Sequence, residues 1–415
     1  MEPRHPSKDI VASLSRELAG HCIILGVTAS ASIYRSLDTA RALMRRGADV
    51  KVIMTRAAAK LVSPTLFHWA TGNRPIVDIG GDIEHVSLSR ECTAMLIAPA
   101  TYSTITKLAY GIADSPVSLT AVTAMGYGKP VALVPAMHEG MELSPQYADA
   151  VKRLANTGVL IIPPRRAESA AKYPDPYLVA RVFTSYALRG LDMKGLRVLV
   201  TAGATRSWID SVRFVSNPSS GRMGVELAIE AFSRGATVDL IYGHVDVEVP
   251  HFINVYRVET TEDMANVMHE LTGKFKYDII IGAAAPLDFK VENSYNGKLK
   301  SDSTYTVTLV PSPKTLKNIS IRPGVLISFA ADVANTDEEL LNSAMEKANK
   351  YGADLVVANP VNVGAYGFAS EFDKVVVVDV KDKRTIDLGL RRKEIIAREL
   401  LDIAISKVSK EGRRN

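Results

Sequence analysis

Residues 201–224 combine small residues, hydroxyls, arginines and an amide, which are groups suited to holding anions. A short β-branched run at 197–200 precedes them, and apolar residues recur every fourth position after Gly221, as on one helix face. A strand, a Ser/Gly loop and a helix are therefore expected in that order. The N–H groups at the start of such a helix would point at a bound phosphate. A tight turn capped by Ser219 and Ser220 is the alternative interpretation, because helix N-termini favour serine.

Strand-like runs alternate along the chain with segments long enough for helices, which predicts α/β folds with parallel sheets. A proline-rich stretch and a predicted helix at 177–188 separate two series of such runs. We therefore place a domain boundary near 190–194, with domains at 1–190 and 191–415. The predicted strands are 22–27, 50–54, 95–98 and 131–134 in the first domain, and 197–200, 238–241, 278–282, 325–329, 355–358 and 375–380 in the second.

The composition is that of an ordinary globular protein, with 47% hydrophobic and 23% charged residues among 415. Lys and Arg exceed Asp and Glu by five but are scattered among them, which suits small anionic substrates and gives no support to nucleic-acid binding. We expect a cytoplasmic protein without a membrane partner, because no apolar leader segment or membrane-length apolar run is present. Cys22 and Cys92 are too few for a disulfide framework or a thiolate zinc site.

Several common motifs are absent from the sequence. Neither Gly-x-Gly-x-x-Gly after the first strand nor a P-loop occurs, so a nucleotide would have to be bound by another loop, and an ordinary NAD dehydrogenase is poorly supported. His-Glu-x-x-His and Gly-x-Ser-x-Gly are also missing, which disfavours the commonest metallohydrolases and serine hydrolases. No pattern identifies metal ligands.

The motifs within 201–224 resemble the signature of the phosphopantothenate–cysteine ligases: Thr-Ala-Gly-x-Thr, Ile-Asp-x-Val-Arg and Asn-x-Ser-Ser-Gly-x-Met-Gly, in that order. The resemblance continues at 282–285, 298–300, 329–331 and 353–359. It implies a Rossmann-like α/β ligase domain that joins 4′-phosphopantothenate to cysteine. In that reaction the carboxylate attacks the α-phosphate of a nucleoside triphosphate and releases pyrophosphate, and the amine of cysteine then displaces the nucleoside monophosphate from the acyl-nucleotidylate. The implied cofactor is Mg²⁺ and the implied co-substrate is CTP, with ATP left open.

The resemblance also assigns roles to residues of the second domain. Asn217 would contact the acyl-nucleotidylate, and Lys298 and Lys300 would act from a mobile loop, although which lysine dominates stays open. Arg213 could bind phosphopantothenate or pair with Asp210. The nucleotide- or substrate-binding residues expected are Gly203, Thr205, Arg206, Asp210, Arg213, Asn217, Ser219, Ser220, Gly221, Ala284, Ala285, Asp288, Lys298, Lys300, Phe329 and Lys347.

The first domain resembles the flavin-dependent phosphopantothenoylcysteine decarboxylases at 26–32, 52–57, 85–88, 99–101 and 135–137. This resemblance implies a flavodoxin-like parallel sheet of the HFCD flavoprotein type that binds FMN and assembles as trimers. A helix N-terminus near Thr28 and Ser30 could receive the FMN phosphate, although each hydroxyl alone could be a helix cap. The FMN-binding residues expected are Thr28, Ser30, Thr55, Pro99, Thr101, Ser118, Thr120 and Met137.

The catalytic residues of that family match this sequence in part. His85 stands at the active-site histidine of His-x-x-Leu, as a proton shuttle or a contact to the substrate carboxylate. His138 occupies the position of an asparagine that contacts that carboxylate, and residues 163–176 lack the cysteine of the family's flexible loop that protonates the enethiol. We hypothesise that Lys172 or Tyr173 replaces this acid.

The leading interpretation is a bifunctional enzyme of coenzyme A synthesis that makes 4′-phosphopantetheine from 4′-phosphopantothenate, cysteine and a nucleoside triphosphate. Two alternatives stay open: a ligase whose flavin domain is a non-catalytic scaffold, and a flavoprotein with a binding or regulatory role. By resemblance, trimers of the first domain and dimers of the second would close into a dodecamer, a homo-oligomer.

Overall fold

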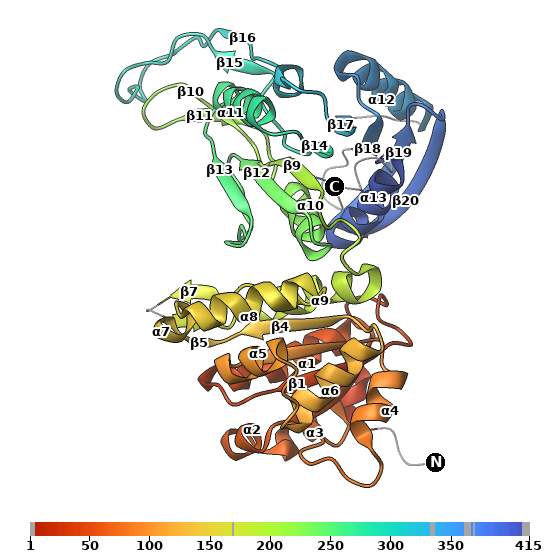
Figure 1. Cartoon of the computed structure of the whole chain (residues 1–415). Helices are drawn as coiled ribbons and strands as arrows, with labels where there is room; N and C mark the ends of the chain where they lie inside the picture. Colours follow the sequence, from red (N-terminus) through yellow and green to blue (C-terminus); the bar gives the residue numbers. More distant parts are fainter. Residues whose placement is uncertain (1–4, 168–169, 333–336, 361–366, 368–369, 409–415) are drawn as a thin grey trace. The chain divides into compact units, whose positions relative to one another are not determined.

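The computed structural model describes residues 5–167, 170–332, 337–360, 367 and 370–408. The chain divides into two compact units, Met1–Leu191 and Asp192–Asn415, each built on its own sheet (Figure 1). The predicted α/β class is therefore confirmed in both units. Within the described residues, no helix is long and apolar enough to cross a membrane.

The first unit contains a five-stranded parallel sheet in the order β2-β1-β3-β4-β6. Its strands are β1 (Cys22–Val27), β2 (Asp49–Met54), β3 (Ala94–Ala100), β4 (Val131–Pro135) and β6 (Leu160–Ile161). The helices are α1 (Arg35–Arg45), α2 (Arg56–Leu61), α3 (Pro64–Thr71), α4 (Glu84–Glu91), α5 (Tyr102–Ala109), α6 (Pro116–Gly126), α7 (Glu139–Glu142), α8 (Pro145–Asn156) and α9 (Pro176–Arg189), with short 3-10 helices η1 (Pro6–Ile10) and η2 (Ala31–Tyr34).

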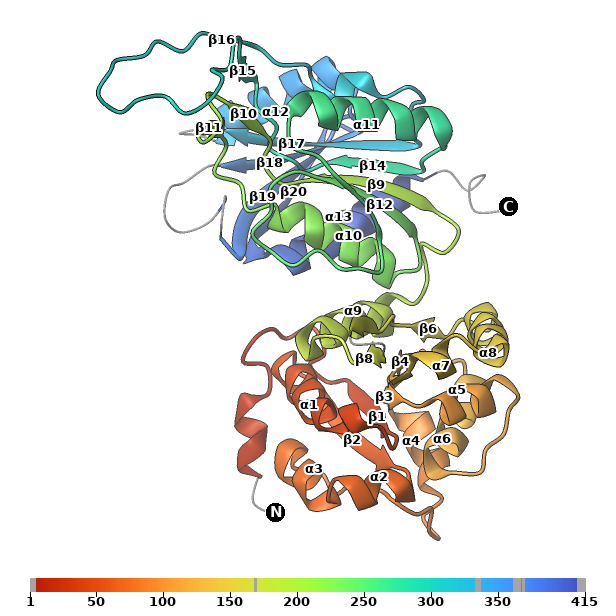
Figure 2. The same cartoon turned by 90° about the vertical axis from the view of Figure 1, so that its left-hand side faces the viewer.

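Helices cover both faces of this sheet because its central strands are apolar on both sides. All residues of β3 and β4 are buried. Side chains of α4, α5, α6 and α8 share one apolar core with the strands, while α1 packs against α9. Figure 2 shows α1 on one side of the strands and α4, α5 and α6 on the other.

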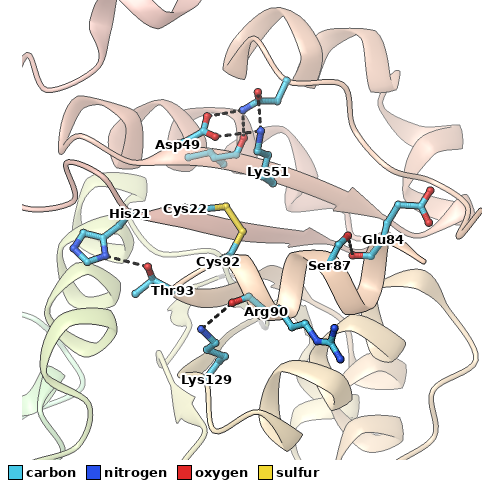
Figure 3. Close-up of a disulfide and its surroundings, with 12 residues drawn as sticks. His21, Cys22, Asp49, Lys51, Glu84, Ser87, Arg90, Cys92, Thr93 and Lys129 are labelled. Atoms are coloured by element: carbon cyan, nitrogen blue, oxygen red, sulfur yellow. Dashed lines mark hydrogen bonds and ion pairs between the residues drawn. A yellow bond between two sulfur atoms is a disulfide. The ribbon is translucent and has the colours of Figure 1, made fainter. Parts of the chain in front are cut away.

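Cys22 and Cys92 form a disulfide, with 4.5 Å between their Cα atoms. Cys22 begins β1, and Cys92 directly follows α4, so the bond joins this strand to the end of that helix (Figure 3). The neighbouring residues are joined as well, since Nδ1 of His21 lies 3.0 Å from the Thr93 hydroxyl. The two cysteines, which the sequence alone did not pair, thus lock α4 to the sheet.

A second, antiparallel sheet of the first unit has the order β5-β8-β7 and consists of β5 (Met137–His138), β7 (Arg165–Ala167) and β8 (Ala170–Lys172). Most of it lies within residues 163–176, the segment that lacks the family's cysteine. Its register places Met137 opposite Ala171 and Arg165 opposite Lys172. This pairing brings two distant candidate residues, His138 and Lys172, onto one small sheet.

The second unit has an eight-stranded sheet in the order β13-β12-β9-β14-β17-β18-β19-β20, in which β19 runs antiparallel to its two neighbours and all other neighbouring pairs are parallel. Its strands are β9 (Arg197–Ala202), β12 (Thr237–Tyr242), β13 (Asn254–Arg257), β14 (Ile279–Gly282), β17 (Val325–Asp332), β18 (Leu355–Pro360), β19 (Phe372–Asp379) and β20 (Arg384–Arg392). Two hairpins are formed by β10 (Arg206–Trp208) with β11 (Phe214–Ser216), and by β15 (Phe289–Val291) with β16 (Leu309–Pro311).

Four helices cover the two faces of this sheet: α10 (Arg222–Ser233), α11 (Thr261–Lys274), α12 (Asp337–Tyr351) and α13 (Lys393–Lys407), with a 3-10 helix η3 (Thr315–Asn318). Side chains of α11 and α12 enter one core with the strands, and α10 packs with α13 on the other face, as Figure 2 shows. Gly224 permits the close approach of α10 to β9, because a Cβ there would lie 2.7 Å from the carbonyl oxygen of Thr201.

Candidate active sites

A cavity of about 390 Å³ lies at the carboxyl ends of β9, β14, β17 and β18 in the second unit. Open α/β sheets bind their ligands at this edge. Nine of the predicted residues line it: Asn217, Ser219, Ser220, Gly221, Ala284, Ala285, Asp288, Phe329 and Lys347. Residues distant in the sequence thus meet at one site.

The start of α10 forms one wall of this cavity. Gly221 is the N-cap residue, with a left-handed φ of 69°, and no side chain caps the helix. Ser219 Oγ accepts a hydrogen bond from the Gly221 N–H at 3.3 Å and reaches no further into the helix. The serines therefore do not satisfy the first turn, whose free N–H groups are suited to an anion.

Asn217 is fixed by the loop that follows β14. Its amide nitrogen donates to the carbonyl oxygens of Ala285 at 3.1 Å and Pro286 at 3.2 Å. Because both donors are used, the side-chain oxygen is the group that is available to a ligand. The nearby Asp288 forms an ion pair with Lys314.

Three other predicted residues do not line the cavity but hold its walls. The Thr205 hydroxyl is fully buried, lying 2.7 Å from the Thr261 hydroxyl and accepting from the Leu287 N–H at 2.9 Å. Gly203 has a left-handed φ of 80°, and a Cβ there would lie 2.3 Å from a backbone oxygen. Arg206 lies 2.9 Å from His244 and stacks on the Phe214 ring.

Asp210 and Arg213 also lie away from the cavity lining and pair with each other at 2.7 Å. Burial would raise the pKa of the Asp210 carboxyl, but the N–H groups of Leu299, Val212 and Arg213 and the Arg213 charge lower it to about 2. Lys298 and Lys300 flank Leu299 and are exposed, outside the lining of the cavity. The structure therefore brings the lysine loop to the β10–β11 turn.

The cavity lining includes charged and polar residues that the sequence analysis did not single out: Arg222, Lys350, Asn359, Asp373 and Lys393. Burial raises the pKa of the Asp373 carboxyl to about 6, although the charge of Lys393 opposes this shift. Burial likewise lowers the pKa of the Lys393 ammonium. Asn359 belongs to a segment noted for its resemblance, but Asp373 and Lys393 carry no sequence signal of burial.

A larger cavity, of about 1170 Å³, lies at the carboxyl ends of β1, β2, β3 and β4 in the first unit. Six of the predicted FMN-binding residues line it: Thr28, Ser30, Thr55, Thr101, Ser118 and Met137. Several of these hydroxyls also cap helices. Thr55 accepts from the Ala58 N–H at the start of α2, and Thr101 caps α5 in the same way. The start of three helices and an array of hydroxyls therefore surround this space.

The small sheet β5-β8-β7 supplies His138 and Lys172 to the lining of the same cavity, and Tyr173, which directly follows β8, lines it as well. His138 is exposed, and its Nδ1 accepts from the Gly140 N–H at 3.4 Å. Tyr173 is buried, and its hydroxyl lies 2.6 Å from that of Thr39. Burial raises the pKa of the Tyr173 phenol. Of the two hypothesised acids, Lys172 is thus the one whose side chain is less enclosed.

Three predicted residues of the first unit lie outside the lining of its cavity. Thr120 is fully buried, and its hydroxyl donates to the Pro116 carbonyl at 2.8 Å. Pro99 contributes its carbonyl oxygen to the Thr28 hydroxyl at 2.7 Å. His85 lies in the first turn of α4, and its Nδ1 is buried without a hydrogen-bond partner.

The described part of the chain contains no group of three or more His, Cys, Asp or Glu side chains that could hold a metal ion. Mg²⁺ that enters with a nucleotide needs no such group, since it is often held by substrate phosphates and one or two carboxylates. Asp288, in the lining of the second unit's cavity, is a carboxylate of that kind.

Comparison with known proteins covers both units. The family described as "Flavoprotein" matches residues 11–183, and the family described as "DNA/pantothenate metabolism flavoprotein C-terminal domain" matches residues 193–408. Three similar proteins carry the name coenzyme A biosynthesis bifunctional protein CoaBC. That of Thermococcus kodakarensis is 40% identical over 383 residues, covering 90% of this chain and 93% of its own. The protein from Methanocaldococcus jannaschii is 35% identical over 381 residues, covering 91% of this chain and 92% of its own.

The protein of Escherichia coli K12 is 30% identical over 416 residues, covering 96% of this chain and 100% of its own. Identity at this level extends across both units, so it is not confined to one shared domain. The chain belongs to the family of CoaBC bifunctional proteins of coenzyme A biosynthesis.

Proposed function

We propose that the chain catalyses two successive reactions of coenzyme A synthesis. The second unit joins 4′-phosphopantothenate to cysteine at the cost of a nucleoside triphosphate, and the first unit decarboxylates the product to 4′-phosphopantetheine. The observation that carries this proposal is that each unit has its own cavity, lined by most of the residues that the corresponding family resemblance assigns.

Support for the ligase reaction comes from the electrostatics of the smaller cavity. A carboxylate must be activated before an amine can displace its oxygen, and its attack on a phosphate needs positive charge around both anions. The uncapped start of α10 and the side chains of Lys347 and Lys350 would provide that charge. Asn217 would contact the acyl-nucleotidylate through its side-chain oxygen. CTP is the proposed nucleotide, with Mg²⁺ bound to its phosphates.

Support for a flavin cofactor comes from the match to the flavoprotein family and from the larger cavity. The hydroxyls of Thr28, Ser30 and Thr55 lie where FMN phosphate and ribityl oxygens would find donors, and Met137 adds an apolar surface for a ring. When bound, FMN would supply two-electron oxidation and reduction. His138 would bind the substrate carboxylate, and Lys172 would donate a proton in place of the missing cysteine.

His85 requires a separate explanation because it does not line the cavity of its own unit. Large apolar side chains are exposed around this unit, including Tyr34 (57%), Leu61 (59%) and Trp69 (59%). These side chains supply apolar area that an assembly would cover. We propose that the first unit forms a homotrimer in which His85 reaches the cavity of a neighbouring subunit. Dimers of the second unit, a dodecamer and a cytoplasmic location stay predictions.

One assay tests the two reactions together. The purified protein is incubated with 4′-phosphopantothenate, cysteine, Mg²⁺ and either CTP or ATP, and the products are separated by mass. We expect phosphopantothenoylcysteine and then 4′-phosphopantetheine, faster with CTP. Accumulation of phosphopantothenoylcysteine alone would make the flavin unit a scaffold. Absence of both products and of pyrophosphate would favour a binding or regulatory flavoprotein.

A further inference from the structure

A polar cluster to which the family resemblance assigns no role lies in the cavity of the second unit. It consists of Arg222, Asn359, Asp373 and Lys393, all of which line the cavity. Asp373 and Lys393 are each 4% exposed, and Asn359 is 6% exposed. Burying a carboxylate, an ammonium and an amide in one place is costly unless they meet partners.

The fold directs these side chains to one face of the sheet. Val357 of β18 lies opposite Val377 of β19. Asn359 is two residues beyond Val357 and Asp373 four residues before Val377, so both side chains point to the face of that pair. Lys393 begins α13 and Arg222 begins α10, and these two helices pack together on one face of the sheet. Acceptors from two strands thus approach donors from two helix starts.

Two of the four residues have a buried polar atom that finds no hydrogen-bond partner among the described residues: Oδ1 of Asn359 and Nε of Arg222. A terminal nitrogen of Arg222 lies 4.0 Å from the Glu371 carboxylate, and Oδ1 of Asp373 accepts from the Lys374 N–H at 3.0 Å. No ion pair between Asp373 and Lys393 is seen in the described part of the chain, although both line the cavity. Lys393 Nζ donates to the Gly367 carbonyl at 2.7 Å, which leaves it two further N–H donors. Buried groups of this kind are usually satisfied by a ligand or by water.

The arrangement selects for a ligand with opposite charges close together. An ammonium group would be accepted by the Asp373 carboxylate and Asn359 Oδ1, and a carboxylate would take hydrogen bonds from Lys393 and Arg222. A phosphate would face repulsion from Asp373, and a metal cation would face repulsion from Lys393 and Arg222. An α-amino acid carries both groups on one carbon atom.

We propose that Arg222, Asn359, Asp373 and Lys393 form the subsite for the amino acid co-substrate of the ligase reaction. This inference rests on the proposed function and deepens it, because it says where cysteine would be held while its amine attacks the activated acyl group. Recognition of both charged groups would favour cysteine over cysteamine, which lacks the carboxylate.

The test separates the two half-reactions. Pyrophosphate release from 4′-phosphopantothenate and CTP without cysteine reports activation, and the KM for cysteine in the complete reaction reports the subsite. For Asp373→Ala we expect pyrophosphate release within about twofold of wild type. We expect the KM for cysteine to rise about ten- to hundredfold, the loss typical of a hydrogen bond to a charged group. Asp373→Asn keeps an acceptor oxygen, so its KM for cysteine should lie between those of wild type and Asp373→Ala.

Two further variants sharpen the test. Lys393→Met removes the charge but keeps an unbranched side chain only one atom shorter, and it should reduce the preference for cysteine over cysteamine. Glu346→Ala removes an exposed carboxylate from α12 of the same unit and should change neither readout. Thermal unfolding of each full-length variant checks that it is folded. If Asp373→Ala does not fold, Asp373→Asn takes its place in the test.

The possible failures are distinguishable. If the wild-type protein releases no pyrophosphate, the proposed ligase function is refuted and the subsite with it. If wild type releases pyrophosphate but Asp373→Ala leaves the KM for cysteine unchanged, the subsite alone is refuted. A rise in the KM for CTP equal to that for cysteine would assign the cluster to the nucleotide and overturn the inference.

Discussion

The carboxylate of Asp210 accepts a hydrogen bond from the N–H of Leu299 at a distance of 3.1 Å. Asp210, in the β10–β11 turn, therefore fixes Leu299, which lies between Lys298 and Lys300. Arg213 strengthens the connection, because its guanidinium donates to Asp210 and, at 3.3 Å, to the Leu299 carbonyl. Of the two roles that were open for Arg213, pairing with Asp210 is the one seen. Asp210 and Arg213 thus position the base of the lysine loop.

The low pKa of Asp210 predicts a pH-dependent contribution to stability. Its folded value of about 2 lies below the ordinary value of 3.8, so its stabilising effect is present above about pH 4 and is lost as the pH falls towards 2. We expect Asp210→Asn to have a lower thermal midpoint of the second unit than wild type at pH 7. This difference between the two midpoints should become smaller as the pH falls from 4 to 2. Thermal unfolding followed by circular dichroism across this range measures the difference.

The control for that experiment is Asp302→Asn, which changes an exposed carboxylate of the same loop. Its midpoint should follow that of wild type at every pH. A deficit of Asp210→Asn that stayed constant down to pH 2 would show that the carboxylate charge is not what holds the loop.

The disulfide between Cys22 and Cys92 predicts a redox-dependent stability of the first unit. It closes a loop with a sequence separation of 70 residues, which restricts the unfolded chain. Replacing both cysteines by serine should lower the free energy of unfolding by about 2–4 kcal/mol, and reductant should lower it in wild type but not in the double variant. Calorimetry with and without dithiothreitol measures this. Titration of two free thiols in denatured, unreduced wild-type protein would contradict the prediction.

The placement of His85 predicts active sites shared between subunits. His85→Gln and Lys172→Gln should each reduce decarboxylation at least about 100-fold while ligation continues, because each removes a proposed acid–base group. Co-expressing the two variants should restore about a quarter of the decarboxylase activity if one site draws His85 and Lys172 from different subunits. Mass measurement of intact assemblies verifies that mixed oligomers form. If mixed oligomers form but show no decarboxylase activity, the shared-site prediction is wrong. His85 would then act in the site of its own subunit, or would not belong to a decarboxylase site.

Local sequence patterns were sufficient to predict most of the sheet strands. Predicted strands at 197–200 and 238–241 became β9 and β12, because buried parallel strands are continuous apolar runs. β20 escaped prediction, since its outer side chains are charged and exposed as in an edge strand. Residues 95–98 became the longer β3, because Ala94 and Ala100 are too small to mark its ends in the sequence.

Residues of the candidate sites could be predicted where several polar or charged side chains occur close together in one segment of the sequence. The loop that carries Asn217 and Gly221 was found because its residue types are unusual together. Thr205 belongs to the same motif, yet its hydroxyl is buried, and sequence alone does not separate these roles. Asp373 and Lys393 were missed because their significance comes from burial beside each other, which depends on how β19 and α13 pack.

Gly224 provides a test of how closely α10 must lie against β9. A Cβ at this position would lie 2.6 Å from the Ala202 Cβ and 2.7 Å from the Thr201 carbonyl oxygen, so the helix would have to move. We expect Gly224→Ala to lower the free energy of unfolding of the second unit by about 1–3 kcal/mol, a typical cost of overpacking. It should also raise the KM for CTP, because the displaced helix start lines the cavity. Urea denaturation and steady-state kinetics measure the two effects.

The matched control is Gly273→Ala, near the end of α11 in the same unit. Its nearest neighbour would be the Ser320 hydroxyl at 3.6 Å, an ordinary contact, and its φ is not left-handed. Because alanine favours helices over glycine, we expect this change to be neutral or to stabilise by up to about 1 kcal/mol. If both substitutions had the same small effect, the close approach at Gly224 would not be needed, and α10 could shift without disturbing the cavity. If Gly224→Ala lowers the free energy of unfolding while Gly273→Ala raises it, Gly224 is needed to hold the start of α10 in its place.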